Sequence, residues 1–404
     1  MRFCMVTTFY PPYHFGGDAT YVRALSRALI SRGHSVEVIH CEDAYRLSGK
    51  GIDPRSANPD DGVLVHRLKS RLGPLSPLIT QQTGRPGLKA VALKAILKRG
   101  FDVVNFHNIS LVGGPAILEL STAPVTLYTL HEHWLLCPTH IFWKNRSKAC
   151  DTKQCVRCSL WSGVPLQWWR YTGLIKRAVG HVDLFLAPSE FTAERHRKAG
   201  IGPVQVLPLF SSLAAEAVGD QTASTVPRFI FVGRVTASKG IHLLLEQFSR
   251  LPQYELIVVG DGDLRAKVER QYAGHDNIRF LGQLPQDKLA AVYRTATALV
   301  LPSLAPETFG LTVTEAFAHG TPAIVRDAGG SRELVDASGG GIVYRTDAEL
   351  LKAIHALARD DALRAQLGQH ARAGFEKFYT EQKHVDAYLA CIHKVRQRVN
   401  TPAQ

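Results

Sequence analysis

The chain has 404 residues, 45% of them hydrophobic, and its 48 Lys and Arg outnumber its 35 Asp and Glu to give a formal charge of +13. This length and apolar content favour two domains over one, and the charge suits nucleotide phosphates, acidic acceptors or anionic lipid surfaces. Zinc-finger spacing, an aromatic ribonucleoprotein motif and a dense basic tract are all lacking, which argues against nucleic-acid binding.

The first half alternates short β-branched runs with helical patterns. Strands are predicted at residues 2–8, 35–41, 62–68, 103–106, 125–130 and 184–187, with a helix over 19–32. Segments of crossover length separate the strands, which predicts parallel pairing. Residues 42–87 are irregular, polar and rich in Pro and Gly, and we expect loops around one strand there.

The second half restarts this rhythm after a Pro- and Ser-containing boundary near residues 207–226. Strands are predicted at 229–232, 255–259, 278–281, 298–301, 323–325 and 342–344, and the chain is helical beyond Glu376. Two doubly wound α/β domains are therefore expected, residues 1–208 and 209–380. Ligands of such sheets bind at the carboxyl ends of the strands, so we expect the site in a cleft between the domains.

The stretch from Pro302 to Gly320 carries the most informative functional signal. It is typical of a strand end, a loop and a helix. Glu307 then lies at a helix N-terminus, where unpaired N–H groups and the helix dipole favour a phosphate. Glu315 lies at most about 12 Å away, so the two carboxylates can hold hydroxyls at opposite ends of one phosphorylated ligand. The simpler alternative is a solvated helix face with a capped turn.

This stretch resembles the E-x7-E signature of retaining glycosyltransferases of family 4, which have the GT-B fold. The residues that match are Glu307-Thr-Phe-Gly-Leu, Glu315-Ala, Gly320-Thr-Pro-Ala, Gly329-Gly330 and Glu333. The resemblance implies two Rossmann-like domains facing a central cleft, with residues 381–404 forming a helix that returns to the N-terminal, acceptor-side domain. It also implies metal-independent transfer of a sugar from a nucleotide diphosphate to an acceptor hydroxyl, in glycan, polysaccharide or glycolipid biosynthesis.

Two cations, Arg234 and Lys239, follow the strand at 229–232 and could neutralise a departing diphosphate. Surface cations in a turn are the alternative, but both residues match the family's diphosphate-binding positions. The resemblance further implies that Glu307 holds hydroxyls of the donor sugar and that Glu315 holds the ribose. The remaining expected donor contacts are Gly16, Gly17, Gly233, Gly260, Leu284, Phe309, Gly310 and Leu311.

His131 ends the strand at 125–130, where the family often has a histidine that contacts the transferred sugar. We therefore group His131 with Glu307, Arg234 and Lys239 as catalytic. His107 is a second candidate, while His133 and His140 suit acceptor-loop or structural roles. No protein base is assigned, because the front-face mechanism implied by the resemblance passes the acceptor's proton to the leaving phosphate.

Four cysteines lie close together in the sequence, with C-x12-C-x4-C-x2-C spacing. Four thiolates at such spacing can enclose zinc or an iron–sulfur cluster, and reduced or redox-active thiols are the alternative. A metal there would order the loop after His131 without doing chemistry. The cysteines are Cys137, Cys150, Cys155 and Cys158.

The sequence shows no secretory signal and no apolar run of membrane-spanning length. We therefore expect a cytoplasmic protein. Basic and aromatic residues mix at 89–99 and 168–177, an arrangement that suits either peripheral contact with the inner face of a membrane or a solvated helix face. An epimerase-like enzyme and a noncatalytic nucleotide-sugar-binding protein remain competing functions on the same scaffold.

Overall fold

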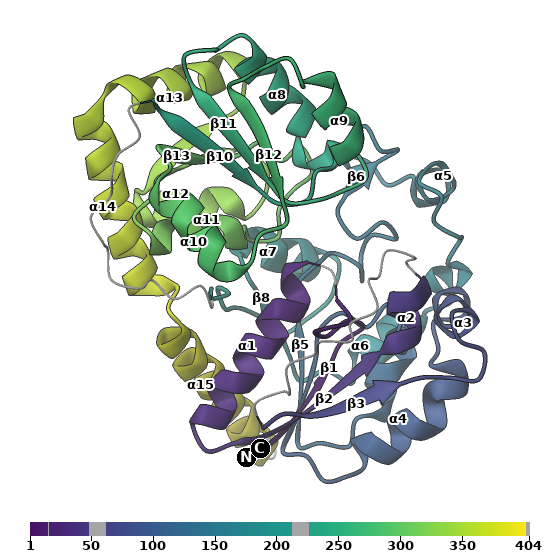
Figure 1. Cartoon of the computed structure of the whole chain (residues 1–404). Helices are drawn as coiled ribbons and strands as arrows, with labels where there is room; N and C mark the ends of the chain where they lie inside the picture. Colours follow the sequence, from purple (N-terminus) through teal and green to yellow (C-terminus); the bar gives the residue numbers. More distant parts are fainter. Residues whose placement is uncertain (15, 48–61, 212–225, 401–404) are drawn as a thin grey trace. The chain divides into compact units, whose positions relative to one another are not determined.

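The computed structural model describes residues 1–14, 16–47, 62–211 and 226–400, which group into two units (Figure 1). Unit 1 comprises Met1–His140, Gln154–Pro208 and Glu381–Gln404, and unit 2 comprises Ile141–Lys153 and Leu209–Thr380. The C-terminal segment thus belongs with the N-terminal unit, as the resemblance implies.

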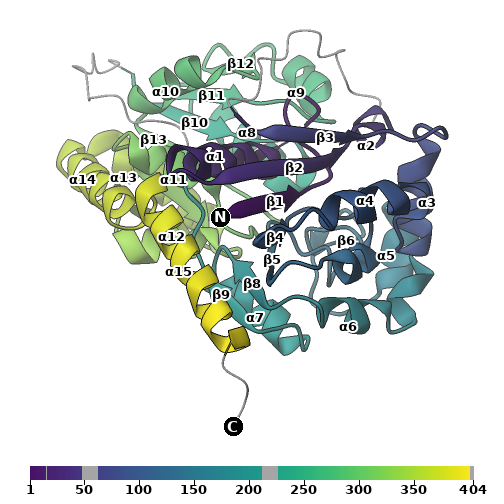
Figure 2. The same cartoon turned by 90° about the horizontal axis from the view of Figure 1, so that it is seen from below.

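In the described residues of unit 1, seven strands form one parallel sheet in the order β3-β2-β1-β4-β5-β8-β9 (Figure 2). The strands are β1 (Arg2–Val6), β2 (Ser35–Cys41), β3 (Leu64–Leu68), β4 (Val103–Phe106), β5 (Val125–Thr129), β8 (Leu184–Ala187) and β9 (Val204–Val206). The helical elements are α1 (Gly17–Ser31), α2 (Glu42–Leu47), α3 (Leu75–Thr83), η1 (Gly87–Lys89), α4 (Ala90–Leu97), η2 (Pro115–Leu120), α5 (Cys155–Trp161), η3 (Trp168–Tyr171), α6 (Leu174–Val179), α7 (Glu190–Lys198) and α15 (Glu381–Asn400).

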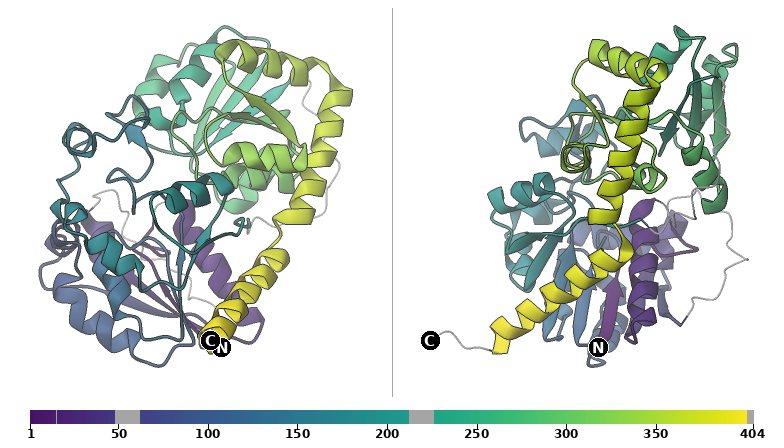
Figure 3. Two further views of the ribbon diagram at one scale, coloured as in Figure 1. Left: turned by 180° about the vertical axis from the view of Figure 1, so that it is seen from behind. Right: turned by 90° about the vertical axis from the view of Figure 1, so that its left-hand side faces the viewer.

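Helices cover both faces of this sheet because successive side chains of a strand point in opposite directions. Cys4 and Val6 of β1 join a buried cluster that includes Leu93 and Leu97 of α4. On the other face, the ring of Phe3 packs 6.3 Å from that of Tyr388 in α15. Helix α15 (Figure 3) is therefore part of the core of unit 1.

The expectation of irregular structure over residues 42–87 is wrong in part. The structure forms α2, α3 and η1 there, besides β3. Helix α3 looks irregular in sequence because it contains Pro77 and several polar residues, but proline is tolerated in a first helical turn. Its buried face consists of Ser76, Pro77 and Thr80, so packing rather than hydrophobic periodicity stabilises it. Residues 48–61 of that stretch lie outside the described residues.

In the described residues of unit 2, six strands form a second parallel sheet in the order β12-β11-β10-β13-β14-β15. The strands are β10 (Arg228–Val232), β11 (Glu255–Val259), β12 (Ile278–Gly282), β13 (Ala298–Leu301), β14 (Ala323–Arg326) and β15 (Gly341–Tyr344). The helical elements are η4 (Ala237–Lys239), α8 (Ile241–Ser249), α9 (Arg265–Gln271), α10 (Gln286–Arg294), α11 (Leu311–Ala318), α12 (Ser331–Ser338), α13 (Asp347–Arg359) and α14 (Asp361–Phe378), and β6 (Trp143–Lys144) and β7 (Lys148–Ala149) form a small hairpin.

The strands of unit 2 are mostly apolar, as expected for a parallel sheet buried on both faces. Phe229 and Phe231 of β10 pack with Leu245 of α8 and Ile354 of α13 in one buried cluster. Among the described residues, no helix is both long and apolar enough to cross a membrane.

Candidate donor-binding site

The order of the strands in unit 2 identifies where a ligand would bind. Strand β10 lies between β11 and β13, so the chain leaves β10 toward one side of the sheet and returns on the other. Crevices form at the carboxyl ends of strands at such a switch point. The loops after β10, β13 and β14 carry Arg234, Lys239, Glu307 and the Gly329-Gly330 pair. All lie at the same edge of the sheet.

Glycines allow these loops to approach backbone to backbone. Gly240 has a φ of +72°, and a Cβ there would lie 2.1 Å from the carbonyl oxygen of Pro302. The carbonyl of Ser238 accepts the N–H groups of Leu304 at 2.8 Å and Ala305 at 3.0 Å. The turn that carries Lys239 is therefore fixed to the loop that carries Glu307.

Lys239 and Glu307 form an ion pair at the centre of this edge. Lys239 Nζ donates to Glu307 Oε1 at 2.6 Å, and Ser303 Oγ donates to the same oxygen. The side chains are 23% and 14% exposed. Burial alone would raise the pKa of Glu307, but Lys239, Ser303 and the charge of Arg234 together lower it. A carboxylate and an ammonium are thus held side by side with little solvent.

The loop after β14 holds the backbone of Glu307. The N–H of Glu307 donates to the carbonyl of Ala328 at 3.0 Å, and the N–H of Gly330 donates to the carbonyl of Glu307 at 2.8 Å. Gly329 has a φ of +89°, and a Cβ there would lie 2.3 Å from the Glu307 carbonyl oxygen. Glycine is needed at position 329 because no side chain fits there between the two loops.

Helix α11 begins directly after this loop. Its N-cap is Gly310, with a φ of +115° and no capping side chain. The first N–H groups of a helix have no acceptor within the helix and favour an anion. Here the N–H of Val313 already donates to the carbonyl of Gly310 at 2.9 Å. The N–H groups of Leu311 and Thr312 are therefore the ones that could meet an anion. Phe309 is buried against the ring of Tyr379, 6.0 Å away. The helix therefore presents backbone donors close to the ion pair.

Glu315 lies on α11, one turn beyond those donors. The hydroxyl of Tyr293 donates to Glu315 Oε2 at 2.7 Å. Burial raises the pKa of Glu315 to about 7, although this hydrogen bond acts in the opposite direction. The carboxyl is thus fixed in orientation and close to half protonated near neutral pH.

Two other expected donor contacts have clear structural roles. The N–H of Gly233 donates to Val259 O, and the N–H of Gly260 donates to Gly282 O. A Cβ on Gly260 would lie 1.9 Å from the Gly233 carbonyl oxygen. Leu284 is half-buried between β12 and α10. Contacts of these three residues with a donor remain predictions.

The glycines predicted in unit 1 lie at the start of α1. Gly16 is the N-cap, with a φ of +82°, and Gly17 is the first helical residue. Asp18 follows, and Asn108 Nδ2 donates to its carboxylate at 3.4 Å. Burial, and then the charge of Glu132, raises the pKa of Asp18 to about 6. Sequence reasoning missed Asp18, although an acidic residue beside a Gly-Gly turn was a visible signal.

His131 and His107 are in direct contact. His107 Nδ1 and His131 Nε2 lie 2.9 Å apart with stacked rings. The ring of Tyr21 packs edge-on, 5.0 Å from that of His131. Burial, and then the charge of His384, lowers the pKa of His131 to about 3. His131 is therefore neutral at pH 7 and can exchange hydrogen bonds with hydroxyls without carrying charge.

Helix α15 contributes a histidine to this cluster that sequence reasoning also missed. His384 Nδ1 lies 2.7 Å from the Pro208 carbonyl, so this nitrogen must donate. Nε2 then accepts the hydroxyl of Tyr21 at 2.7 Å. The two histidines predicted to have acceptor-loop or structural roles have other partners. His133 stacks on His196, and His140 pairs with Glu132 at 2.8 Å.

The cysteine segment spans both units. Cys137, Cys155 and Cys158 belong to unit 1 and Cys150 belongs to unit 2. Cys137 Sγ lies 3.2 Å from the Thr139 hydroxyl. Within the described ranges, no group of three or more His, Cys, Asp or Glu side chains is arranged to hold a metal ion. Metal at these cysteines remains a prediction for elemental analysis.

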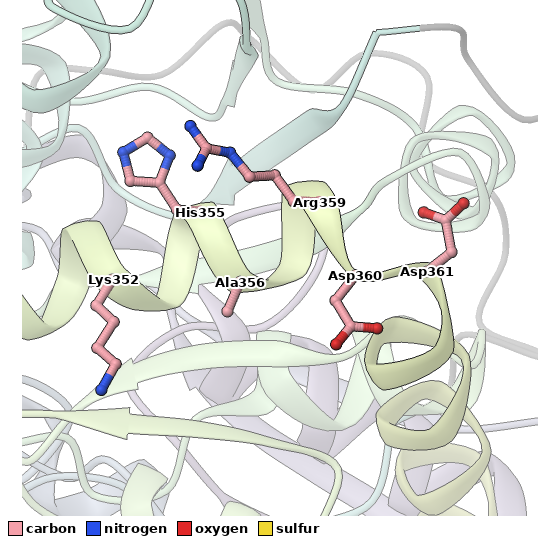
Figure 4. Close-up of a pocket in the computed structure, with 6 residues that line it drawn as sticks. All are labelled: Lys352, His355, Ala356, Arg359, Asp360 and Asp361. Carbon is pink, nitrogen blue, oxygen red and sulfur yellow. The ribbon is translucent and has the colours of Figure 1, made fainter.

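An open hollow lies elsewhere on unit 2, at the junction of α13 and α14 (Figure 4). Arg359 Nε and His355 Nδ1 both contact the hydroxyl of Tyr254, and Asp360 caps α14. These side chains are engaged in packing and capping, and the hollow contains none of the expected site residues. It is lined by Lys352, His355, Ala356, Arg359, Asp360 and Asp361.

Comparison with known proteins identifies the family of this chain. Residues 15–210 match the protein family Glycosyltransferase Family 4, and residues 219–374 match the family Glycosyl transferases group 1. The chain is 27% identical over 398 residues to D-inositol 3-phosphate glycosyltransferase of Xylanimonas cellulosilytica, covering 90% of this chain and 88% of the relative.

Two solved structures share the fold over nearly the whole chain. Sucrose-phosphate synthase of Thermosynechococcus elongatus aligns with a TM-score of 0.69 at 19% identity, covering 98% of this chain and 99% of the other. Anabaena HepE in complex with UDP aligns with a TM-score of 0.68 at 17% identity, covering 98% of this chain and 100% of the other. The same protein has also been solved in complex with UDP-glucose.

Proposed function

We propose that this chain, which belongs to the group 1 glycosyltransferases of family 4 and has the GT-B fold, moves a sugar from a nucleotide diphosphate to an acceptor hydroxyl with retention of the anomeric configuration. The Lys239–Glu307 ion pair beside the N-terminus of α11 is the observation that supports this proposal most strongly.

Each charged residue of this site has a role in the proposal. Glu307 accepts hydrogen bonds from the hydroxyls of the donor sugar, and Lys239 with Arg234 stabilises the diphosphate as negative charge develops on it. The N–H groups of Phe309, Gly310 and Leu311 approach the sugar and diphosphate. Glu315, already oriented by Tyr293, accepts from the ribose.

The reaction exchanges one bond at the anomeric carbon. The bond to the diphosphate oxygen breaks, and that oxygen takes the electron pair. The acceptor oxygen forms the new bond on the same face, and its proton passes to the departing phosphate. No protein base is required, and neutral His131 serves as a hydrogen-bonding group for the sugar.

The proposal also names a class of donor and a class of acceptor. HepE has been solved with UDP and with UDP-glucose, so uridine diphosphate sugars are the first donors to test. For the acceptor we propose a glycan, a lipid-linked sugar or a small metabolite. The proposal places the reaction in biosynthesis of a glycan or glycolipid.

Release of nucleoside diphosphate tests the activity. Thermal-shift screening against uridine, guanosine and adenosine diphosphate sugars first identifies a stabilising donor, because a ligand that binds the folded state raises the melting temperature. Release that depends on added acceptor, with an α-linked product from an α-linked donor, supports the proposal. An epimerase-like enzyme would change the sugar without acceptor, and a noncatalytic protein would bind the donor without turnover. Either result would contradict it.

A further inference from the structure

Exposed apolar side chains are concentrated on one part of unit 1. In the described residues, fourteen large hydrophobic side chains are exposed, and ten of them lie between Leu72 and Tyr171. Several are more than half exposed, including Val91 at 82%, Trp161 at 66% and Trp168 at 62%. The ten, here called the apolar patch, are Leu72, Leu75, Ile79, Leu88, Val91, Val156, Leu160, Trp161, Trp168 and Tyr171.

Members of the apolar patch recur at helical spacing on short elements. Leu75 and Ile79 are four residues apart on α3, and Val156 and Leu160 are four apart on α5. Trp168 and Tyr171 are three apart on η3. Residues three or four apart lie on the same side of a helix, so each element presents an apolar stripe outward while other residues face the core.

Neighbouring elements of the apolar patch are in contact. Trp169 of η3 is buried and its Nε1 donates to the carbonyl of Gln81 in α3 at 2.7 Å. A Cβ on Gly87, the first residue of η1, would lie 3.5 Å from the Ile79 side chain. Figures 1 and 2 both place α3, α4 and α5 along the same side of unit 1. The apolar stripes of α3, η1 and η3 therefore adjoin, and α4 and α5 lie on the same side of unit 1.

The same surface is strongly basic. Residues 62–101 and 152–182 contain no Asp or Glu, yet they supply every element of the apolar patch. Eleven exposed Lys and Arg lie on these stretches. Arg99 pairs with Glu37 and Arg177 with Glu119, and in the part of the chain that the structure describes the other nine take part in no ion pair. The nine are Arg67, Lys69, Arg71, Arg85, Lys94, Lys98, Lys153, Arg157 and Lys176. A partner of negative charge is favoured.

We propose that the apolar patch docks unit 1 on an anionic phospholipid bilayer. Trp and Tyr favour the boundary between headgroups and acyl chains, aliphatic side chains enter the apolar region, and Lys and Arg attract anionic headgroups. A nucleic acid would match the charge but not Leu75, Ile79, Leu88 or Val91, which offer no ring for base stacking. This docking does not depend on sugar transfer.

The apolar patch is connected to the histidine cluster within unit 1. Arg170 of η3 lies over the rings of Trp134 and Trp169, at 5.2 and 4.7 Å. Its guanidinium donates to the carbonyl of Trp134 at 2.8 Å, three residues after His131. Docking at η3 would thus bring the membrane close to the segment that follows His131, where a membrane-held acceptor could be presented.

Co-sedimentation with vesicles tests the proposal. The whole protein is mixed with vesicles of phosphatidylcholine alone or with phosphatidylglycerol added, at low and high salt. We expect binding that rises with phosphatidylglycerol and falls with salt. The triple variant Trp161→Ser, Trp168→Ser and Tyr171→Ser should bind about a hundredfold more weakly, because three exposed side chains lose their apolar contact.

A matched pair of charge variants separates the apolar patch from the overall charge. Replacing Arg85, Lys94 and Lys98 by Gln should weaken binding to the anionic vesicles about a hundredfold, since each cation near the surface contributes about fivefold. Replacing three exposed lysines elsewhere by Gln changes the net charge equally and should change binding less than about threefold. The control lysines are Lys198, Lys267 and Lys352.

Three results would overturn the proposal. The first is that the wild type does not bind anionic vesicles, and the second is that both charge variants lose vesicle binding equally. The third is self-association of the wild type that the triple variant abolishes, because the apolar patch would then be an interface between copies of the chain. Unchanged near-ultraviolet circular dichroism and unfolding midpoints of the variants verify the fold. Because vesicle binding requires neither donor nor acceptor, failure here leaves the proposed transfer reaction untouched.

Discussion

The Lys239–Glu307 pair allows its structural and functional contributions to be measured separately. At 2.6 Å, two unit charges attract by about 6 kcal/mol at an effective dielectric constant near 20. Desolvation and the partial exposure of both side chains offset most of this attraction. Lys239→Met should therefore destabilise the protein by about 2 kcal/mol and Glu307→Gln by about 1 kcal/mol, measured by urea unfolding.

The double variant Lys239→Met, Glu307→Gln removes both charges at once. It should recover about 1 kcal/mol relative to the sum of the single variants, because neither charge is left without its partner. Activity should not recover: kcat/KM should fall about 100- to 1000-fold in each single variant and at least as far in the double variant. Return of activity together with stability would refute the donor-binding role and leave a structural ion pair.

Three further predictions concern pH, backbone and histidine. Because burial raises the pKa of Glu315 from 4.5 to about 7, folding favours its protonated form. The free energy of unfolding of the wild type relative to Glu315→Gln should therefore fall as pH rises from about 4.5 through 7. A difference in unfolding free energy that is constant with pH would contradict this. Gly329→Ala should cost about 2 to 4 kcal/mol in urea unfolding, whereas Gly33→Ala, also at positive φ but with nothing within 4 Å of the new Cβ, should cost about 1 kcal/mol. His131→Ala should lower kcat about 100-fold or more while the donor Kd changes less than about threefold; a selective loss of donor affinity would assign His131 to binding alone.

Most strands could be predicted from the sequence because both faces of each parallel sheet are buried, so the strands are short apolar runs. The strands at 35–41, 103–106, 184–187, 255–259 and 298–301 match the structure to the residue. Strand β9 was missed because it has three residues, only two of them apolar. Helices α2 and α3 were missed because their helical state depends on burial of a few small and polar residues, which periodicity does not reveal.

The candidate donor-binding edge of unit 2 could be predicted from the sequence, but the structural reasons for the glycines of its motif could not. The sequence places Lys239 and Glu307 in two loops, and only the structure shows that Gly240 allows those loops to touch. Gly329 allows a third loop, after β14, to pack against the loop that carries Glu307. The contact between Tyr21 and His384 joins positions 363 residues apart. No local pattern encodes such a pair, since the fold alone brings α15 to α1.

A crystal structure with a nucleoside diphosphate selected by thermal shift tests the central claim most directly. The account predicts diphosphate oxygens within hydrogen-bonding distance of Lys239 Nζ, the Arg234 guanidinium and the first N–H groups of α11, with the ribose hydroxyls on Glu315. A nucleotide bound elsewhere, with the Lys239–Glu307 pair and Glu315 making no contact to it, would contradict the account.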